Sequence, residues 1–449
     1  MPDWLLAVFR LLAASDEASE GLGFGGETWV ALYGEQLARL QWDYETWGFA
    51  LSPDVACVQP KGRTPPVGCN LRSLSLHLSL LPPRQIVQTK HLPSNNVRAG
   101  ASKPPHRRRP RRRPVMGALL VPFPYTIQDK DVVGEPVDKH WGHLRLGCSW
   151  AKGKPSTELA PFVEELINQC PAKVDLLVFP EVALSWAQLE AVKAVVQRRR
   201  VRLLVAGVHD VSGPGPGRNL AVGVLANARG GKSSIEWSQS KHHRWRVERW
   251  QVQNYGLPLH KTMSWWEDID VSERAVVAAR FVEGATVACL VCEDLARVEP
   301  VQPAIREMGV SLVVALLLDG PQRKDRWAAK STTIFADDPG SSVLVLTSLA
   351  LVRRSLIFRD RHEGSASPAV GLWQEPGHGA VEIPLRPDAH AVYFRLEVTE
   401  QEERTLDGRS DGRTAEVLRL IDRKKGSAFH SVVHPNAPAW AVPLYRTSP

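Results

Sequence analysis

Three residues of this chain have types that cooperate in acyl-transfer chemistry, namely the carboxylate of Glu181, the ammonium group of Lys241 and the thiol of Cys292. Each directly follows a stretch with the pattern of a β-strand. Reactive groups of open α/β sheets usually lie at such strand ends. A thiol there is a candidate nucleophile, a carboxylate its candidate base, and an ammonium group a candidate partner for a developing oxyanion.

The elements that must position these residues alternate between strands and helices from about residue 115. Strands are predicted at 119–125, 141–148, 174–181, 201–208, 287–291, 310–318 and 341–349, a hairpin at 219–225 and 234–237, and helices at 156–170, 186–200, 301–308 and 326–336. Strands that alternate with helices predict an α/β fold in which helices pack on both sides of sheets.

The rest of the chain has a different composition. Residues 1–50 have Leu and Trp at helical spacing, and residues 51–114 form a Pro- and Arg-rich segment that we expect to be a disordered linker or basic arm. We assign residues 115–400 to the α/β domain. Residues 401–449 are expected to be a C-terminal extension with a short helix at 414–423.

The positive charge of the 449-residue chain is concentrated in one segment. The formal net charge is +8, yet the stretch between Asp54 and Asp129 holds 13 Lys and Arg and no acidic residue. The remaining 43 Lys and Arg are outnumbered by 48 Asp and Glu. Contact with nucleic acid or another polyanion is therefore predicted only for the tract Arg107–Arg113, for which a solvated linker is the alternative.

Cysteine usage and hydropathy bear on the compartment. The six cysteines have irregular spacing, which is not the pattern of a disulfide framework and favours a reducing cytoplasm. No run approaches the about 18 apolar residues that a membrane span needs, so no membrane contact is expected.

The order carboxylate, ammonium, thiol at strand ends resembles the nitrilase superfamily of carbon–nitrogen hydrolases. The resemblance covers residues 115–400. It is carried by Pro180-Glu181, the strand from Asn219 and the glycine turn that lead to Lys241, Cys292 followed by Asp294, and the helix from Arg326 before the strand at 343–348. It implies an α-β-β-α sandwich, here with an N-terminal helical and low-complexity extension, and a Glu-Lys-Cys triad.

The resemblance also implies roles for these residues. Glu181 is the general base and acid, Cys292 forms a thioester with an amide or nitrile carbon, and Lys241 stabilises the oxyanion together with the backbone N–H of Glu293. Glu248 matches the second glutamate of the family, which orients the lysine or the water. Asp294 is expected to hold the loop after the nucleophile. Neither a metal nor an organic cofactor is required.

The segment after Lys241 departs from the family by being basic and aromatic. Arg244, Arg246 and Arg249 at a pocket rim predict an anionic substrate or a charged partner. His242 and His243 beside these arginines are interpreted as surface or supporting residues. The tryptophans nearby are interpreted as core, pocket lining or an oligomer contact, and a homo-oligomer is expected.

Three other motifs point to different chemistry, but their context does not support it. Cys289-x-x-Cys292 lacks the second ligand pair of a structural zinc site. The acidic pair Asp337-Asp338 ends a predicted helix and has no companion acidic strand. Gly230-Gly231-Lys232-Ser233 lies in a turn between two strands and lacks the first glycine of a phosphate loop.

Two functions remain. The first is an amide-hydrolysing enzyme, with an amidase preferred to a true nitrilase and a small-molecule amide or nitrile as substrate. The second is a nitrilase-like effector or interaction module, similar to domains associated with phage-defence reverse transcriptases. The Arg-rich arm and the unusual loop after Lys241 are compatible with the second function.

Overall fold

The computed structural model describes residues 56–58, 78–80 and 88–92, and residues 114–442 apart from 212–215, 227–233, 283–284, 356–367, 403–413 and 424–427. The predicted helical segment 1–50, the tract Arg107–Arg113 and the turn at 230–233 lie outside the described residues.

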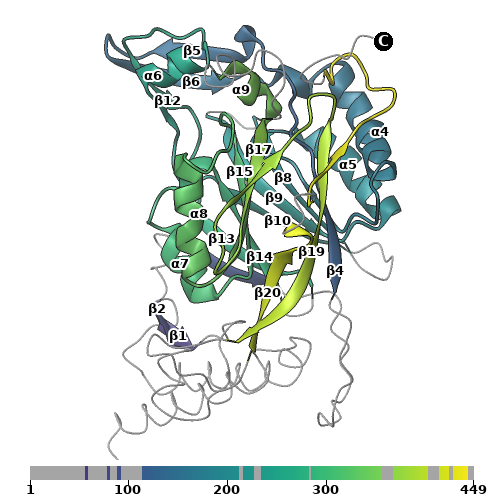
Figure 1. Ribbon diagram of the computed structural model, residues 1–449. Coiled ribbons are helices and arrows are strands. Elements are labelled where there is room, and N and C mark those ends of the chain that lie inside the picture. The colour runs from purple at the N-terminus through teal and green to yellow at the C-terminus, as the bar shows by residue number, and fades with distance from the viewer. Residues whose placement is uncertain are drawn as a thin grey trace, which may run out of the picture.

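Two large sheets form the centre of the molecule (Figure 1). The first has the order β10-β9-β8-β7-β4-β19-β20, with β21 paired to β19. Its parallel part is β4, β7 and β8, and the antiparallel pair β9–β10 confirms the predicted hairpin. The strands are β4 (Val115–Leu120), β7 (Leu176–Val178), β8 (Leu203–Asp210), β9 (Arg218–Leu225), β10 (Ile235–Ser240), β19 (Ala391–Glu402), β20 (Thr414–Leu420) and β21 (His430–Val432).

The second sheet has the order β18-β17-β16-β15-β14-β13-β3. Strands β14, β15 and β16 are parallel, so their carboxyl ends lie at the same edge. The strands are β3 (Gln88–Leu92), β13 (Ala275–Arg280), β14 (Thr286–Val291), β15 (Leu312–Leu317), β16 (Ser342–Thr347), β17 (Ala369–Gln374) and β18 (Val381–Pro384). β14 and β15 are buried along almost their whole length, as expected for parallel strands covered on both faces.

Helices cover the outer faces of both sheets (Figure 1). α4 (Lys154–Asn168) and α5 (Trp186–Arg199) lie over the first sheet, and α7 (Val301–Met308) and α8 (Trp327–Asp337) lie over the second. The inner faces of the sheets meet, and the side-chain amide of Gln239 joins them by donating to the Cys289 carbonyl at 2.8 Å and accepting from the Val277 N–H at 3.2 Å. The predicted α-β-β-α sandwich is confirmed.

Smaller elements lie at one end of the sandwich, near the top of Figure 1. They include α6 (Arg249–Asn254), α9 (Leu349–Arg354) and a four-stranded sheet with the order β11-β12-β6-β5. Its strands are β5 (Val132–Pro136), β6 (Trp141–Leu146), β11 (Arg246–Val247) and β12 (Ser264–Glu267). Three short helical turns are η1 (Asp129–Asp131), η2 (Ser149–Ala151) and η3 (Cys292–Leu295), and β1 (Ala56–Val58) pairs with β2 (Leu78–Leu80).

The structure corrects two predictions about the chain's organisation. The segment 51–114 is not an unstructured linker throughout, because β3 pairs with β13 at the edge of the second sheet. The predicted strand at 141–148 is confirmed as β6, which lies in the small sheet. The predicted helix at 414–423 is strand β20, because the long strand β19 crosses the expected boundary at residue 400 and pairs with it.

None of the helices within the described ranges has both the length and the apolar character that crossing a lipid bilayer would require.

Candidate active site

Glu181 sits in a tight turn directly after β7. Its side chain is 2% exposed. A Cβ on Gly207 of the neighbouring strand β8 would lie 2.2 Å from the Pro180 carbonyl oxygen, so only glycine allows this strand to approach the turn. Val182, next in the chain, has a left-handed backbone with φ of 47°, and its carbonyl accepts a hydrogen bond from the Trp150 indole at 3.2 Å. The turn therefore holds Glu181 in one place.

Lys241 follows β10 and is fully buried, with 1% of its side chain exposed. Its backbone N–H donates to the Asn219 carbonyl at 2.8 Å, which fixes the residue beside β9. The ammonium group donates to Glu181 Oε1 at 2.7 Å and to Glu267 Oε2 at 2.6 Å. An ammonium group has three N–H donors, so one remains for a substrate oxygen.

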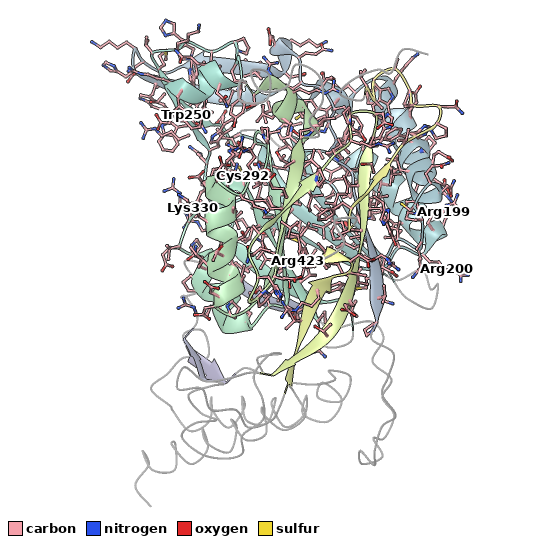
Figure 2. The ribbon with its side chains drawn as sticks, viewed as in Figure 1. Arg199, Arg200, Trp250, Cys292, Lys330 and Arg423 are labelled. Carbon is pink, nitrogen blue, oxygen red and sulfur yellow. The ribbon has the colours of Figure 1, made fainter. Side chains whose placement is uncertain are left out.

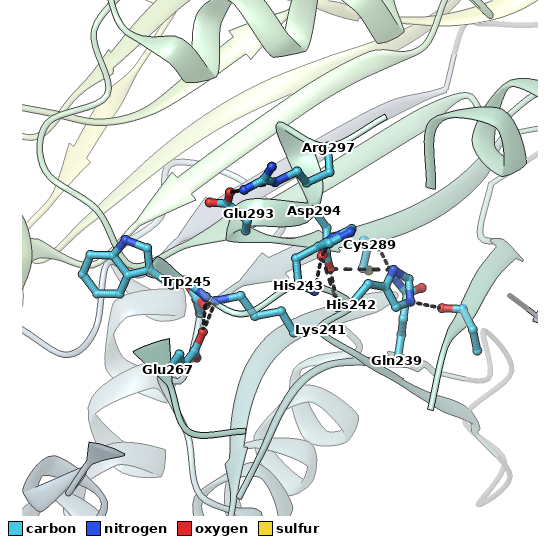
Figure 3. A network of polar contacts seen from close by, with 12 residues as sticks. Gln239, Lys241, His242, His243, Trp245, Glu267, Cys289, Glu293, Asp294 and Arg297 are labelled. Atoms are coloured by element: carbon cyan, nitrogen blue, oxygen red, sulfur yellow. Dashed lines mark hydrogen bonds and ion pairs between the residues drawn. The ribbon is translucent and has the colours of Figure 1, made fainter. Parts of the chain in front are cut away.

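Glu267 is the buried carboxylate that the sequence interpretation missed. It ends β12, and its Oε2 also accepts a hydrogen bond from the Trp245 backbone N–H at 3.0 Å (Figure 3). The run Ser264-Trp-Trp-Glu267 is a strand that ends in a carboxylate, which is the same pattern that identified Glu181. That pattern would have found it.

Glu248, predicted to orient the lysine, lies elsewhere. It precedes the first residue of α6, its side chain is 42% exposed, and its carboxylate pairs with Arg246 at 3.2 Å. In the structure, Glu267 and not Glu248 binds the ammonium group of Lys241. The reason is that the segment after Lys241 forms β11, α6 and β12, and it is β12 that returns a carboxylate to the site.

Cys292 is the first residue of η3, at the carboxyl end of β14 (Figure 2). It is 6% exposed and has a left-handed backbone with φ of 45°. Such a conformation is uncommon for a residue with a side chain and is typical of positions that the surrounding fold holds in place, functional sites among them. Cys292 and Lys241 thus reach one region from facing sheets.

The electrostatics of Glu181, Lys241 and Cys292 follow from burial and mutual charge. Burial raises the pKa of the Cys292 thiol well above its usual value; the negative charge of Glu181 raises it further and Lys241 lowers it. Burial also raises the pKa of Glu181, against the lowering effect of Lys241. Burial would lower the pKa of Lys241, but Glu181, Glu267 and Cys292 outweigh it and raise that pKa well above the usual value, so the ammonium group stays protonated.

The two oxygens of Glu181 differ. Oε1 accepts hydrogen bonds from Lys241 and from the Asn219 side-chain amide, the latter at 2.8 Å. Oε2 is buried, and within the described part of the chain no donor reaches it. A buried carboxylate oxygen without a partner is costly in a folded protein, and it is available to take a proton.

Asp294 joins the loop after Lys241 to the loop after Cys292 (Figure 3). It is completely buried and accepts hydrogen bonds from the backbone N–H groups of His242 and His243, at 3.1 and 3.0 Å, and interacts with His243 Nδ1 at 3.0 Å. This geometry agrees with its predicted role in holding the loop. The neighbouring Glu293 directs its side chain outward to Arg297, at 2.9 Å.

Another buried carboxylate, Asp319, follows β15, the strand parallel to β14. Its Oδ1 accepts hydrogen bonds from the Tyr255 hydroxyl at 2.5 Å, the Gly320 N–H at 2.7 Å and Arg326 at 2.9 Å. Its Oδ2 accepts hydrogen bonds from Gln322 and the Trp327 indole, both at 3.2 Å. We call Asp319 and these five partners the Asp319 cluster.

The predicted arginine rim is not a cluster of free cations. Arg244 donates to the Ile269 carbonyl at 3.0 Å, and Arg246 lies 5.5 Å from the Trp266 ring centroid and pairs with Glu248. Arg249 is exposed at the first position of α6. Two of the three predicted rim arginines are therefore engaged by contacts within the small sheet and its neighbouring loop.

Comparisons with known proteins were made by sequence and by structure. Neither the scan against protein-family models nor the search of curated proteins found a match. Solved structures similar to this chain include members of the nitrilase superfamily.

Three of these similar structures have sequence identities of 11–12%. Nit3 from Saccharomyces cerevisiae has a TM-score of 0.37 and 11% identity, over 63% of this chain and 89% of that one. An amidase from Nesterenkonia sp. AN1 in complex with acrylamide has a TM-score of 0.36 and 12% identity, over 62% and 90%. A glutamine-dependent NAD+ synthetase from Acinetobacter baumannii has a TM-score of 0.36 and 12% identity, over 64% of this chain and only 46% of the synthetase.

Proposed function

We propose that this protein is a carbon–nitrogen hydrolase that cleaves amides through a thioester on Cys292. The observation that carries the proposal is the unpartnered, buried Oε2 of Glu181, because Glu181 acts electrostatically on the Cys292 thiol and its other oxygen is held by Lys241. A nucleophile, a base and an oxyanion partner are thereby brought together in one buried site.

The first half-reaction forms the acyl-enzyme. Glu181 Oε2 takes the thiol proton, and Cys292 Sγ attacks the carbonyl carbon of the amide. The third N–H of Lys241 and the backbone N–H of Glu293 stabilise the oxyanion. The carbon–nitrogen bond then breaks as Glu181 returns the proton to the nitrogen, so ammonia or an amine leaves.

The second half-reaction regenerates the thiol. Glu181, ionised again, takes a proton from a water molecule that attacks the thioester carbon. The carbon–sulfur bond breaks, the acid product leaves, and the proton on Glu181 returns to Cys292. Lys241 stays protonated throughout, because two carboxylates keep its pKa high.

The charges near the thiol favour a neutral or cationic acyl group. Besides Glu181, the negative charges of Asp319 and Glu293 act on Cys292 and raise its pKa, and Lys241 acts in the opposite sense. An anionic acyl group would meet this negative field. The anionic substrate predicted from Arg244, Arg246 and Arg249 has no support from their contacts, since the first two are engaged elsewhere.

The proposed function is tested by ammonia release from a panel of aliphatic, aromatic and aminoacyl primary amides. The wild-type chain and Cys289→Ala should release ammonia, whereas Cys292→Ala should not. Cys289 is the matched control, because it is a buried free thiol three residues away within β14. Ammonia release that persists in Cys292→Ala, or a folded wild-type protein inert toward the whole panel, would contradict the proposal.

A further inference from the structure

Asn219 contacts the three charged residues of the buried site, Glu181, Lys241 and Glu267. It lies in β9, and its backbone carbonyl accepts the Lys241 N–H. Its side-chain Nδ2 donates to Glu181 Oε1 at 2.8 Å and to Glu267 Oε1 at 2.9 Å. The residue is 1% exposed, so water does not compete for these hydrogen bonds.

The orientation of the amide is fixed by its neighbours. If the side chain were flipped, Oδ1 would face two carboxylate oxygens at hydrogen-bonding distance, which is repulsive. The nitrogen therefore faces the carboxylates, and it offers one N–H to each. In this orientation Oδ1 is buried, and among the described residues it has no hydrogen-bond partner.

The amide leaves the two carboxylates unequal. Glu267 has both oxygens occupied, with Asn219 on Oε1 and with Lys241 and the Trp245 N–H on Oε2. Glu181 has only Oε1 occupied. Two carboxylates beside one ammonium leave an excess negative charge in a buried site, so the site has a tendency to bind a proton. The free oxygen of Glu181 is where that proton can bind without breaking a hydrogen bond.

We propose that Asn219 is a positioning residue that selects Glu181, and not Glu267, as the carboxylate that takes the thiol proton. This inference rests on the proposed function. By donating to both carboxylates at once, the amide keeps Glu267 saturated and directs the open acceptor of the pair to Glu181 Oε2. It also stabilises the ionised form of Glu181, and so keeps the base unprotonated at neutral pH.

The other titratable and charged groups near Glu181 do not hide the effect of Asn219 on the pH dependence of Cys292. Lys241, Glu267 and Cys292 face Glu181; His209 faces Glu267, and Asp319 and Glu293 face Cys292. Burial lowers the pKa of His209, so this imidazole is neutral at and above pH 7. At and above pH 7 the carboxyl proton of Glu181 and the thiol proton of Cys292 are thus the ones that control the nucleophile.

The test is the pH dependence of alkylation of Cys292 by iodoacetamide, followed by mass spectrometry on the full chain. In Asn219→Ala the midpoint should move up by about one pH unit, because the Glu181 carboxylate loses a donor. In Asn219→Asp it should move up further, because a third negative charge is added. In Glu267→Gln it should move down, because the negative charge that raises the pKa of Glu181 is removed.

Asn168→Ala is the matched control. The Asn168 amide also donates to a carboxylate, Glu165 Oε2 at 3.1 Å, but on the exposed face of α4, so its removal should leave the profile unchanged. Thermal unfolding confirms that each variant is folded. Midpoints within about 0.2 pH units of wild type in both Asn219 variants, or a uniform loss of rate at every pH, would overturn the positioning role.

The alkylation profiles also distinguish a failure of the proposed function from a failure of the role proposed for Asn219. If Glu181 is not the base, wild type and Glu181→Gln alkylate at the same rate and with the same pH profile, whatever Asn219 does. If Glu181 is the base but Asn219 does not position it, Glu181→Gln is slow and only the Asn219 shifts are missing.

Discussion

Two buried carboxylates, Glu181 and Asp319, follow strands of the two facing sheets, and both act on the Cys292 thiol. They differ in how their oxygens are satisfied. Asp319 accepts five hydrogen bonds from two arms of the chain around Tyr255 and Arg326. Glu181 accepts two, both on Oε1, and Oε2 has no donor within the described ranges.

On the proposed function, this difference separates a structural carboxylate, Asp319, from a reactive one, Glu181. The donors to Asp319 occupy both of its oxygens, and through them this carboxylate ties β15, α6 and α8 together. Glu181 is left with an acceptor that the fold does not use. Burial and nearby charge alone do not distinguish the two residues, whereas the free oxygen does.

The largest effect is expected from Glu181→Gln. The amide cannot accept the thiol proton, so amide turnover should fall by a factor of about 10² to 10⁴. The free energy of unfolding should change little, because a buried negative charge is removed and the shape is kept. Steady-state ammonia release and urea unfolding of the same preparation measure both quantities. A comparable loss of turnover in Asp319→Asn, with unfolding unchanged, would erase the distinction between the two carboxylates.

Asp319→Asn should act in the opposite way. It leaves the largely buried guanidinium of Arg326 without its carboxylate and should lower the free energy of unfolding by about 3 kcal/mol. Alkylation of Cys292 should remain within about threefold of wild type. Urea unfolding measures the first quantity, and an unchanged midpoint would show that the Asp319 cluster does not stabilise the fold.

Gly207→Ala tests whether the turn positions the reactive carboxylate. The added Cβ would lie 2.2 Å from the Pro180 carbonyl oxygen, so Glu181 must move. We expect about tenfold slower alkylation of Cys292 and a free energy of unfolding lower by about 2 kcal/mol. The control is Gly379→Ala, because no atom lies within 4 Å of the Cβ position there. Equal effects at both glycines would count against the positioning of Glu181 by β8.

The smallest effect concerns charge selection. Iodoacetamide and iodoacetate are similar in size and differ in charge. We expect Cys292 to react about tenfold more slowly with iodoacetate, relative to the ratio for free cysteine, because the negative charges of Glu181, Asp319 and Glu293 act on the thiol. The two alkylation rates are measured by mass spectrometry of the peptide that contains Cys292. A ratio that favours iodoacetate would restore the anionic substrate predicted from the arginine rim.

The sequence was sufficient to predict the sandwich, and to predict that Glu181, Lys241 and Cys292 follow strands of it, because both depend on local pattern. Buried runs such as Val287–Val291 mark strands, and residues at their carboxyl ends converge when the strands are parallel. The same pattern failed at Thr414–Leu420, where pairing with β19 overrides helical propensity.

Local sequence pattern could not predict the role of Glu267 or the Asp319 cluster. The distance along the chain from Lys241 favoured Glu248, and only the fold of the intervening β11 and α6 shows that β12 delivers Glu267 to the ammonium group. Likewise, the saturation of Asp319 depends on Tyr255 and Trp327, which approach from separate segments. Such convergence is a property of tertiary packing.

The central claim is that the unpartnered oxygen of Glu181 activates Cys292. Its most direct test is the rate of iodoacetamide labelling at Cys292 at pH 7.5, compared among wild type, Glu181→Gln and Asp319→Asn, with the modified thiol located by peptide mass spectrometry. We expect Cys292 to be labelled in wild type and Asp319→Asn, and to be labelled at least about 100-fold more slowly in Glu181→Gln. Equal labelling of Glu181→Gln and wild type would contradict it.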